Sequence, residues 1–217
     1  MPRFVLQSRE RLARFGGYER HVAEIGQVPT REQSWHDFFN MAVWAHFPRT
    51  RWALNRVHTA PTRARVDPRN GRTPRQNLAA QLDESGIIVA SSDRELLEDL
   101  RALRFKSALW HRRGELLATT CFRIVGHGTL ESLLSPHPAL ACKAVLLELT
   151  RPAAEYHDDA LRFELDERAA REVDGWGEEP ARLAPLPVLG IPGYADDAHE
   201  AFYHDARYFR VQRVRSE

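Results

Sequence analysis

The sequence lacks long apolar runs and is poor in cysteine, and each absence argues against a class of protein. No run approaches the roughly 18 apolar residues that cross a bilayer, and the segment MPRFVLQSRERLARF has no apolar stretch of signal-peptide length. We therefore expect a cytoplasmic protein with no membrane partner. The two cysteines, Cys121 and Cys142, are too few to staple a domain of this size, so we expect buried, reduced thiols.

Familiar catalytic signatures are missing as well. The chain contains no HxxxH, HExxH or CxxC pair, no G-x-S-x-G elbow, and no Walker or dinucleotide glycine pattern. The turn Gly126-His127-Gly128 lacks the third glycine and the acidic partner of a dinucleotide site. These motifs therefore assign no activity, and whether the protein is an enzyme stays open at this point.

Lysine is scarce, and arginine supplies most of the positive charge, unevenly along the chain. Residues 49–75 contain eight arginines and one acid, Asp67, although the net charge is only +1. Such a stretch is typical of a surface that binds RNA or a phosphorylated ligand. Residues 59–76 hold no aromatic side chains among the arginines, whereas proteins that bind single-stranded RNA usually stack its bases on aromatic rings. A non-catalytic domain for an anionic partner is therefore our alternative hypothesis.

The remaining composition is that of a globular protein, with 43% hydrophobic and 28% charged residues in a chain of 217. Helical and extended patterns are interspersed without a βαβ rhythm. This predicts an α+β fold, a single compact domain with a helical N-terminal half packed on a small mixed sheet. We assign 1–29 to an N-terminal arm, 30–214 to the domain, and the proline-rich segment 59–76 to a surface loop.

Local signals place the expected elements. A capping box at Thr30–Gln33 predicts a helix whose apolar face includes Trp35 and Phe38, and a second one at Ser92–Glu95 predicts a leucine-rich helix. Further helices are expected over residues 49–58, 129–134 and 161–173. Strands are expected over residues 87–90, 116–125, 143–149 and 208–214.

Several motifs in a fixed order resemble one bacterial family. They are SWHDFFN at 34–40, FPRT at 47–50, LN at 54–55, DESG at 83–86, GHGTLE at 126–131, LPVLGIPG at 186–193, and AFY at 201–203 followed by Asp205 and FR at 209–210. The family is catalogued only as a domain of unknown function, family 3025, and the similarity spans residues 30–210. The chain departs from the family's usual pattern at Gly128, Thr129, Tyr194 and His204. The resemblance implies one full-length domain and no particular activity.

Two expected helices joined at Pro48 carry polar side chains that folding could gather into one pocket. His36 and Asn40 share a face of the first helix, and Asn55 and His58 share a face of the second. Imidazole is a common zinc ligand, and one histidine from each helix plus a carboxylate would make a catalytic three-ligand site. The predicted metal ligands are His36, His58 and His127.

His127 is the most interesting single candidate, because glycines on both sides suggest that another group, such as an anion, approaches the backbone there. The candidate catalytic residues are His36, Asp37, Asn40 and His127. The candidate ligand-binding residues are Arg49, Asn55, Asp83, Glu84 and Glu131. We favour a small metal-assisted hydrolase acting on a small molecule, with a divalent metal as the candidate cofactor. A structural protein without a pocket stays open, since each residue also has an ordinary role in capping or solvation.

Overall fold

The computed structural model describes residues 2–61, 66–195 and 199–209, and it confirms a single compact α+β domain. Its centre is a mixed sheet with the strand order β4-β3-β5-β6. The strands are β3 (Gly86–Ser91), β4 (Thr120–Ile124), β5 (Ala141–Glu148) and β6 (Ala184–Pro187). Strand β3 runs parallel to β5 and antiparallel to β4, and β5 runs antiparallel to β6. Because β3 is central, all of its residues are buried.

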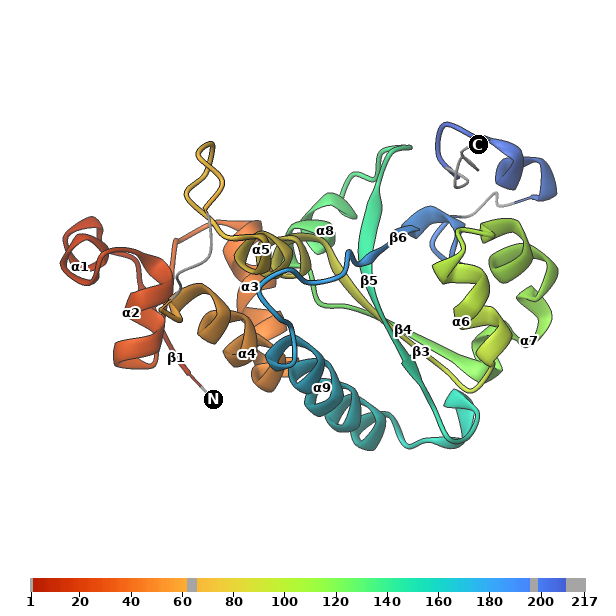
Figure 1. Ribbon diagram of the computed structural model, residues 1–217, viewed down its shortest axis with the longest axis horizontal. Coiled ribbons are helices and arrows are strands. Elements are labelled where there is room, and N and C mark those ends of the chain that lie inside the picture. The colour runs from red at the N-terminus through yellow and green to blue at the C-terminus, as the bar shows by residue number, and fades with distance from the viewer. Residues whose placement is uncertain (1, 62–65, 196–198, 210–217) are drawn as a thin grey trace.

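The two faces of the sheet are covered by different helices (Figure 1). Side chains alternate along a strand, so Ile88 and Ala90 pack against α4 (Pro48–Thr59), α5 (Pro74–Ser85) and α9 (Asp158–Asp174). Ile87 and Val89 pack on the other side. There they meet α6 (Arg94–Arg101), a π-helical segment (Lys106–His111), α7 (Arg113–Thr119) and the C-terminal turns.

Residues 2–30 form a folded unit on one end of the molecule (Figure 1). Strands β1 (Arg3–Leu6) and β2 (Gln27–Thr30) pair in parallel, and α1 (Arg9–Phe15) and α2 (Tyr18–Ile25) connect them. Val22 and Val28 pack with Trp44 in a small apolar cluster. The segment that we set apart as an arm is therefore built onto the helical half.

Two helix starts differ from the prediction. Thr30 ends β2, and α3 (Trp35–His46) begins after Ser34, whose hydroxyl caps its first turn. In the same way α6 begins after Asp93, which supplies the cap in place of Ser92. The capping-box positions were wrong because another short polar side chain lies nearer to the helical run.

Helix α5 lies where the sequence predicted a loop and a turn. Its own capping box joins Thr73 and Gln76, each side chain bonding the other's backbone amide. The prolines and glycine before it hid this start. The omission matters for function, since Asp83 and Glu84 occupy the last turn of α5.

Other differences concern strands. Helix α7 occupies residues that we predicted as strand from 116 onward, and only β4 is extended there. Of the strand predicted over 208–214, residues 210–214 lie outside the described residues, and Tyr208 lies in a turn. Among the described helices, none has the length and apolarity to cross a membrane.

Candidate functional site

The side chains of His36 and His127 meet at the junction of α3 and α8 (His127–Ser132). The Ser34 cap places His36 in the first turn of α3, and His127 is the first residue of α8. Their Nε2 atoms are 3.0 Å apart, and the rings pack edge to face with centroids 4.4 Å apart. Two histidines far apart in sequence therefore point the same nitrogen at one location.

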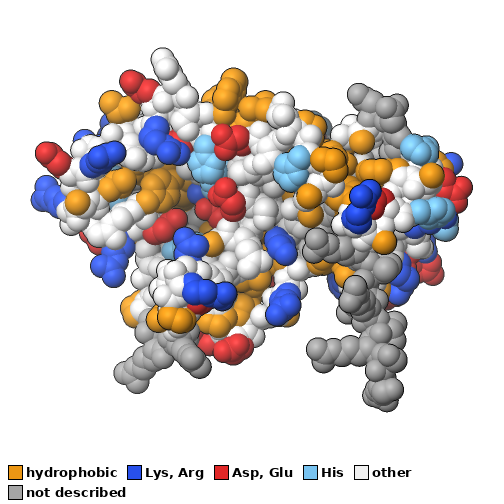
Figure 2. Space-filling model, turned by 90° about the horizontal axis from the view of Figure 1, so that it is seen from above, with side chains coloured by type: hydrophobic (Ala, Val, Ile, Leu, Met, Phe, Trp, Pro, Cys, Tyr) orange, Lys and Arg blue, Asp and Glu red, His pale blue; other side chains and the backbone are white. Residues whose placement is uncertain are grey.

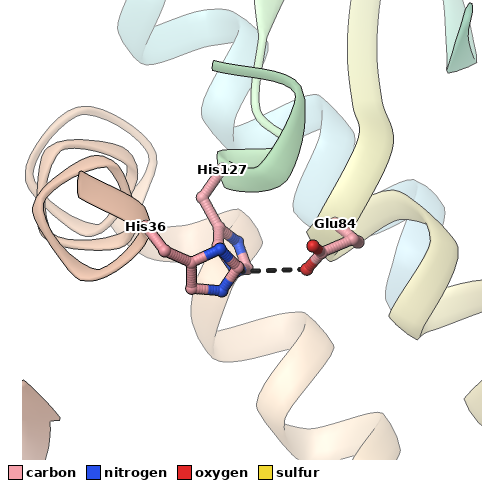
Figure 3. A group of neighbouring side chains, drawn as sticks. All are labelled: His36, Glu84 and His127. Carbon is pink, nitrogen blue, oxygen red and sulfur yellow. Dashed lines mark hydrogen bonds and ion pairs between the residues drawn. The ribbon is translucent and has the colours of Figure 1, made fainter. Parts of the chain in front are cut away.

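Glu84 brings a carboxylate to the same location from the end of α5. Its Oε2 lies 3.3 Å from His127 Nε2, and potential ligand atoms of all three residues lie within 4.8 Å of one another. Figure 3 shows the three side chains converging from separate elements. His127 is buried, His36 is half-buried and Glu84 is exposed, so the group opens to solvent. We call His36, Glu84 and His127 the three-residue cluster.

The glycines around His127 make room for the protein itself. A Cβ at Gly126 would overlap the backbone of Ser85 and Gly86, and a Cβ at Gly128 would overlap the Glu84 carboxylate. The close approach that we expected at this turn is therefore made by the end of α5. Figure 2 shows the result on the surface, where histidine and acidic side chains lie side by side near the middle of one face.

Each histidine has a further carboxylate beside its other nitrogen. Glu131, on α8, lies 3.0 Å from His36 Nδ1, and Asp83 Oδ1 lies 3.6 Å from His127 Nδ1. The first distance is that of a hydrogen bond, and the second is longer than one. Carboxylates in this position fix the tautomer and orientation of metal-binding histidines, by receiving Nδ1–H and leaving Nε2 free to ligate.

A buried chain of polar side chains holds Asp83 in place. Arg51, on α4, is 4% exposed and forms an ion pair with Asp83. The Arg51 guanidinium also donates to Asn40 Oδ1 at 2.8 Å, and Asn40 Nδ2 donates to the Tyr18 hydroxyl at 2.9 Å. Removing one member would leave a buried charge or donor without its partner, which is costly. Arg51, itself bonded to Asn40, therefore helps to keep Asp83 behind His127.

The same surroundings keep His127 uncharged. Burial lowers the pKa of His127 to about 4, and the Arg51 charge acts in the same direction. A neutral imidazole is the form that can ligate a metal. At neutral pH this histidine is therefore a lone-pair donor.

The cysteines have no part in the cluster. Both are free and buried, as expected. Burial raises the pKa of Cys142 to about 12 and also raises that of Cys121. Since the thiolate is the nucleophile, neither side chain is an activated one.

Several predicted residues lie apart from the cluster. Asp37 turns to Arg31, which donates to it from its backbone amide at 2.6 Å and from its guanidinium at 2.7 and 3.0 Å. Asn55 donates to Glu19. Arg49 lies over the Phe163 ring of α9, 4.2 Å from its centroid.

His58, a predicted metal ligand, is not part of the three-residue cluster, and Glu84 supplies the third side chain. His58 lines a cleft that also borders Asp83 and Glu84. The cluster thus contains His36 and His127 from the predicted metal set. It also contains Glu84 from the predicted ligand-binding set. Two more residues of that set, Glu131 and Asp83, lie beside the Nδ1 atoms of His36 and His127.

Arg51 is the polar residue whose role the sequence missed. From the sequence we placed it only within the arginine-rich stretch 49–75, as part of a candidate surface for an anionic partner. A signal was present, because Arg51 and Asn55 are four apart on α4 and so share the face already predicted to be polar. The charge of Arg51 hid the fact that this face is buried.

Most described arginines of the 49–75 stretch bond or pair with other residues of the same chain. Arg56 pairs with Asp174, Arg69 pairs with Asp67, and Arg75 donates to the Asp174 carbonyl. The exposed positive surface is therefore smaller than the sequence indicates. Residues 63 and 65 lie outside the described part of the chain.

The fold and the cluster define an α+β protein with a histidine–carboxylate group at a junction of three helices. The chain matches the model of a family of proteins of unknown function, DUF3025, over residues 2–213, and it belongs to that family. The match begins at residue 2, before the first of the motifs quoted above, and it includes the N-terminal unit. No curated protein and no solved structure matches the chain.

Proposed function

We propose that this protein is a metal-dependent hydrolase whose divalent ion is bound by His36, Glu84 and His127. The observation that carries the proposal is the distance between the two Nε2 atoms, with a carboxylate beyond each ring. In a tetrahedral zinc site with bonds of about 2.0–2.1 Å, neighbouring ligand atoms lie about 3.3 Å apart. The separations of 3.0 Å between the histidines and 3.3 Å from His127 to Glu84 are close to that value, and all three potential ligand atoms lie within 4.8 Å of one another.

The hydrogen bond of His36 supports the same assignment. Glu131 can receive the Nδ1–H of His36, which leaves the His36 Nε2 lone pair directed at His127 Nε2. Asp83 Oδ1 lies 3.6 Å from His127 Nδ1, beyond hydrogen-bond distance. A cation between the two Nε2 atoms, or a proton on one of them, would satisfy both. Gly128 adds to this, since it leaves space for the Glu84 carboxylate to approach. Two histidines and one carboxylate leave a coordination position open, as in catalytic zinc sites.

The chemistry follows from such an open position. A zinc-type ion lowers the pKa of bound water to about 7 and polarises a carbonyl or phosphoryl oxygen. The half-open mouth beside Glu84 and His36 would admit an ester or phosphoester. Glu131 and Asp83 would orient the two imidazoles, and Arg51 would hold Asp83. We also propose, from the sequence, a bacterial cytoplasmic location.

The alternative, a domain that binds RNA through residues 49–75, has less support. Arg51, Arg56 and Arg69 are all paired with acids of the same chain. An RNA contact would have to break these pairs or use other residues. Phosphate contacts weaken as salt rises, so a salt titration with single-stranded RNA tests this alternative directly.

The test of the metal centre is elemental mass spectrometry on protein purified without chelators or an affinity tag. We expect near-stoichiometric zinc or a similar ion in the wild type and loss of it in His127→Ala and His36→Ala. His46→Ala is the matched control, since His46 is an exposed residue at the other end of α3 and its imidazole bonds the Ala42 carbonyl of the same helix. Glu131→Gln should retain the site but weaken affinity about 10- to 100-fold.

Circular dichroism of each variant separates loss of metal from loss of fold. Wild-type protein that stays metal-free after incubation with zinc would overturn the proposal. So would metal content that is equal in the wild type and in folded His127→Ala. Metal that depends on these side chains would direct activity assays to a panel of carboxylic and phosphoric esters.

A further inference from the structure

A groove runs along α5 and ends at the three-residue cluster. It has a volume of about 490 Å³. One wall is a single face of α5, where Asn77, Gln81 and Glu84 follow one another at helical spacing. The other wall includes Glu19, from α2, and His58, from α4, and Arg72 also lines the groove.

The two ends of this groove differ in chemistry. Arg72 directly precedes Thr73, the cap of α5, and the His58 carbonyl accepts a hydrogen bond from Gln76 at 3.1 Å. Both residues therefore belong to the end where α5 begins. Glu84 lies at the end where α5 stops. At a rise of about 1.5 Å per residue, the stretch from Asn77 to Glu84 spans about 10 Å.

The first end presents donors that the protein does not use. Neither the Arg72 guanidinium nor the His58 imidazole makes a hydrogen bond or ion pair with another residue of the described segments. Arg56, Arg69 and Arg75, from the same arginine-rich stretch, all have such partners. Glu19, on the same wall, accepts from Asn55 Nδ2 at 2.6 Å. Asn55 is a neutral donor, so Glu19 remains a carboxylate on this wall, and burial lowers the pKa of His58, which makes its imidazole a neutral donor. Arg72 is therefore the cation that this end offers to an anion, with His58 beside it as a neutral hydrogen-bond donor.

We infer that the groove is the substrate site, with an anionic group of the substrate held by Arg72 and His58. The bond to be hydrolysed then lies at the three-residue cluster. Glu84 is eight residues further along α5 than Gln76, which bonds the His58 carbonyl, and this is a distance of about 12 Å by the helix rise. A carboxylate or a phosphate has the required chemistry, because guanidinium binds both through charge-assisted hydrogen bonds. This inference rests on the proposed function. It narrows the substrate class to anionic esters or phosphoesters with the anion remote from the reacting group.

The experiment uses the zinc-loaded full chain and hydroxamates, which bind zinc through two oxygens. Acetohydroxamate measures the metal end alone. Hydroxamates with a terminal carboxylate on a short, a matching and a long spacer probe the other end, and calorimetry gives each Kd. We expect the carboxylate on the matching spacer, about 12 Å long by the helix rise, to strengthen binding about tenfold or more, as charge-assisted hydrogen bonds do.

Variants of groove residues test whether the tighter binding of the carboxylate-bearing hydroxamate comes from the groove. Arg72→Ala should remove the gain and leave acetohydroxamate binding and zinc content unchanged, and His58→Ala should reduce it. Arg69→Ala is the matched control, since it removes the same charge from a neighbouring side chain that is 87% exposed and does not line the groove.

The outcomes separate this inference from the proposed function. Zinc bound normally, with no gain from any carboxylate or phosphonate or with a gain that survives Arg72→Ala, would overturn the groove as an anion site and leave the metal centre standing. Protein that binds no zinc would overturn the proposed function and this inference together. A gain with a phosphonate in place of the carboxylate, but not with the carboxylate, would identify the anion as phosphate.

Discussion

Helices α3 and α6 distribute their side chains in opposite ways. Helix α6 buries Leu97 and Leu100 against the sheet and exposes charged residues such as Glu98. Helix α3 buries the polar residues Asp37 and Asn40 together with Val43 and Trp44. It turns Trp35 and Phe38 toward solvent, where they are 60% and 50% exposed. Helix α6 therefore buries a mainly apolar face, whereas α3 buries a mixed polar and apolar face and exposes aromatic side chains.

The difference follows from what each helix packs against. Helix α6 lies on the sheet, and burying leucines there is favourable in itself. The inner side of α3 meets α8 and the buried Arg51, so a polar face is needed to satisfy that charge and to present His36. A buried polar face is stable only if all of its groups are paired. An inverted helix of this kind therefore marks a region shaped for something other than core packing.

The aromatic side of α3 is partly shielded by its own side chains. The Trp35 ring packs edge to face with Phe38, centroids 5.6 Å apart, and is stacked with Phe39 at 6.0 Å. Exposed apolar patches commonly border binding sites. Here the patch begins at the residue before His36, at the edge of the three-residue cluster.

A substitution in the buried apolar face of α6 should lower the free energy of unfolding more than any other change considered below. Leu97→Ala leaves a cavity in a fully packed core and is expected to lower the free energy of unfolding by about 2–5 kcal/mol. Urea denaturation followed by circular dichroism measures the change. Metal content per folded molecule should stay the same, because α6 lies on the other side of the sheet from the cluster.

The control for this change is Leu117→Ala, in which the same atoms are removed from a side chain that is 60% exposed. That variant should stay within about 0.5 kcal/mol of the wild type. Equal losses in the two leucine variants would mean that α6 does not form part of the core, and the comparison would fail.

The two helices also show which buried faces could be predicted from the sequence and which could not. The leucines of α6 predicted both the helix and its buried face, because apolar side chains at helical spacing have one favourable arrangement on a sheet. The same rule gave the wrong face for α3, since the aromatic residues are more apolar than the polar residues that are buried. Which face is buried depends on Arg51 and Asp83, which are distant along the chain and pair only after folding.

The cluster was predictable in part for the same reason. His36 and His127 were selected by their local settings, a helix start and a glycine-flanked turn. Glu84 was among the predicted ligand residues, but its helix was missed, so its place beside His127 was not foreseen. His58 was predicted as a ligand from its spacing to Asn55, and it lies along the groove instead. Spacing fixes the face of a helix, whereas the packing of α3, α5 and α8 fixes which faces meet.

Asp37→Asn tests the buried polar face of α3, and we expect a smaller loss of unfolding free energy than in Leu97→Ala. Burial raises the pKa of Asp37, but the hydrogen bonds from Arg31 outweigh it and leave the pKa below its usual value. The carboxylate therefore adds stability above its unfolded pKa of about 4, and that contribution is lost as the pH falls through the lower folded value. We expect the variant to lose about 1–3 kcal/mol at neutral pH.

The measurement is urea denaturation of both proteins at several pH values, with a chelator present so that metal does not contribute. The difference between wild type and variant should shrink steadily below about pH 4. Asp174→Asn, which breaks an exposed pair with Arg56, should cost no more than about 1 kcal/mol at any pH. A difference that grows on acidification would contradict the lowered pKa.

Phe38→Ser tests the aromatic side of α3 and should have the smallest effect. Half of this side chain is already in water, so its removal loses only the contacts with Trp35 and Phe39. We expect a change of no more than about 1 kcal/mol in unfolding free energy, with metal content unaltered. A loss as large as that of Leu97→Ala would show that the aromatic face is packed, and α3 would then be an ordinary amphipathic helix. A small loss together with weaker binding of hydroxamates that carry an apolar tail would instead connect the exposed face of α3 to the neighbouring cluster.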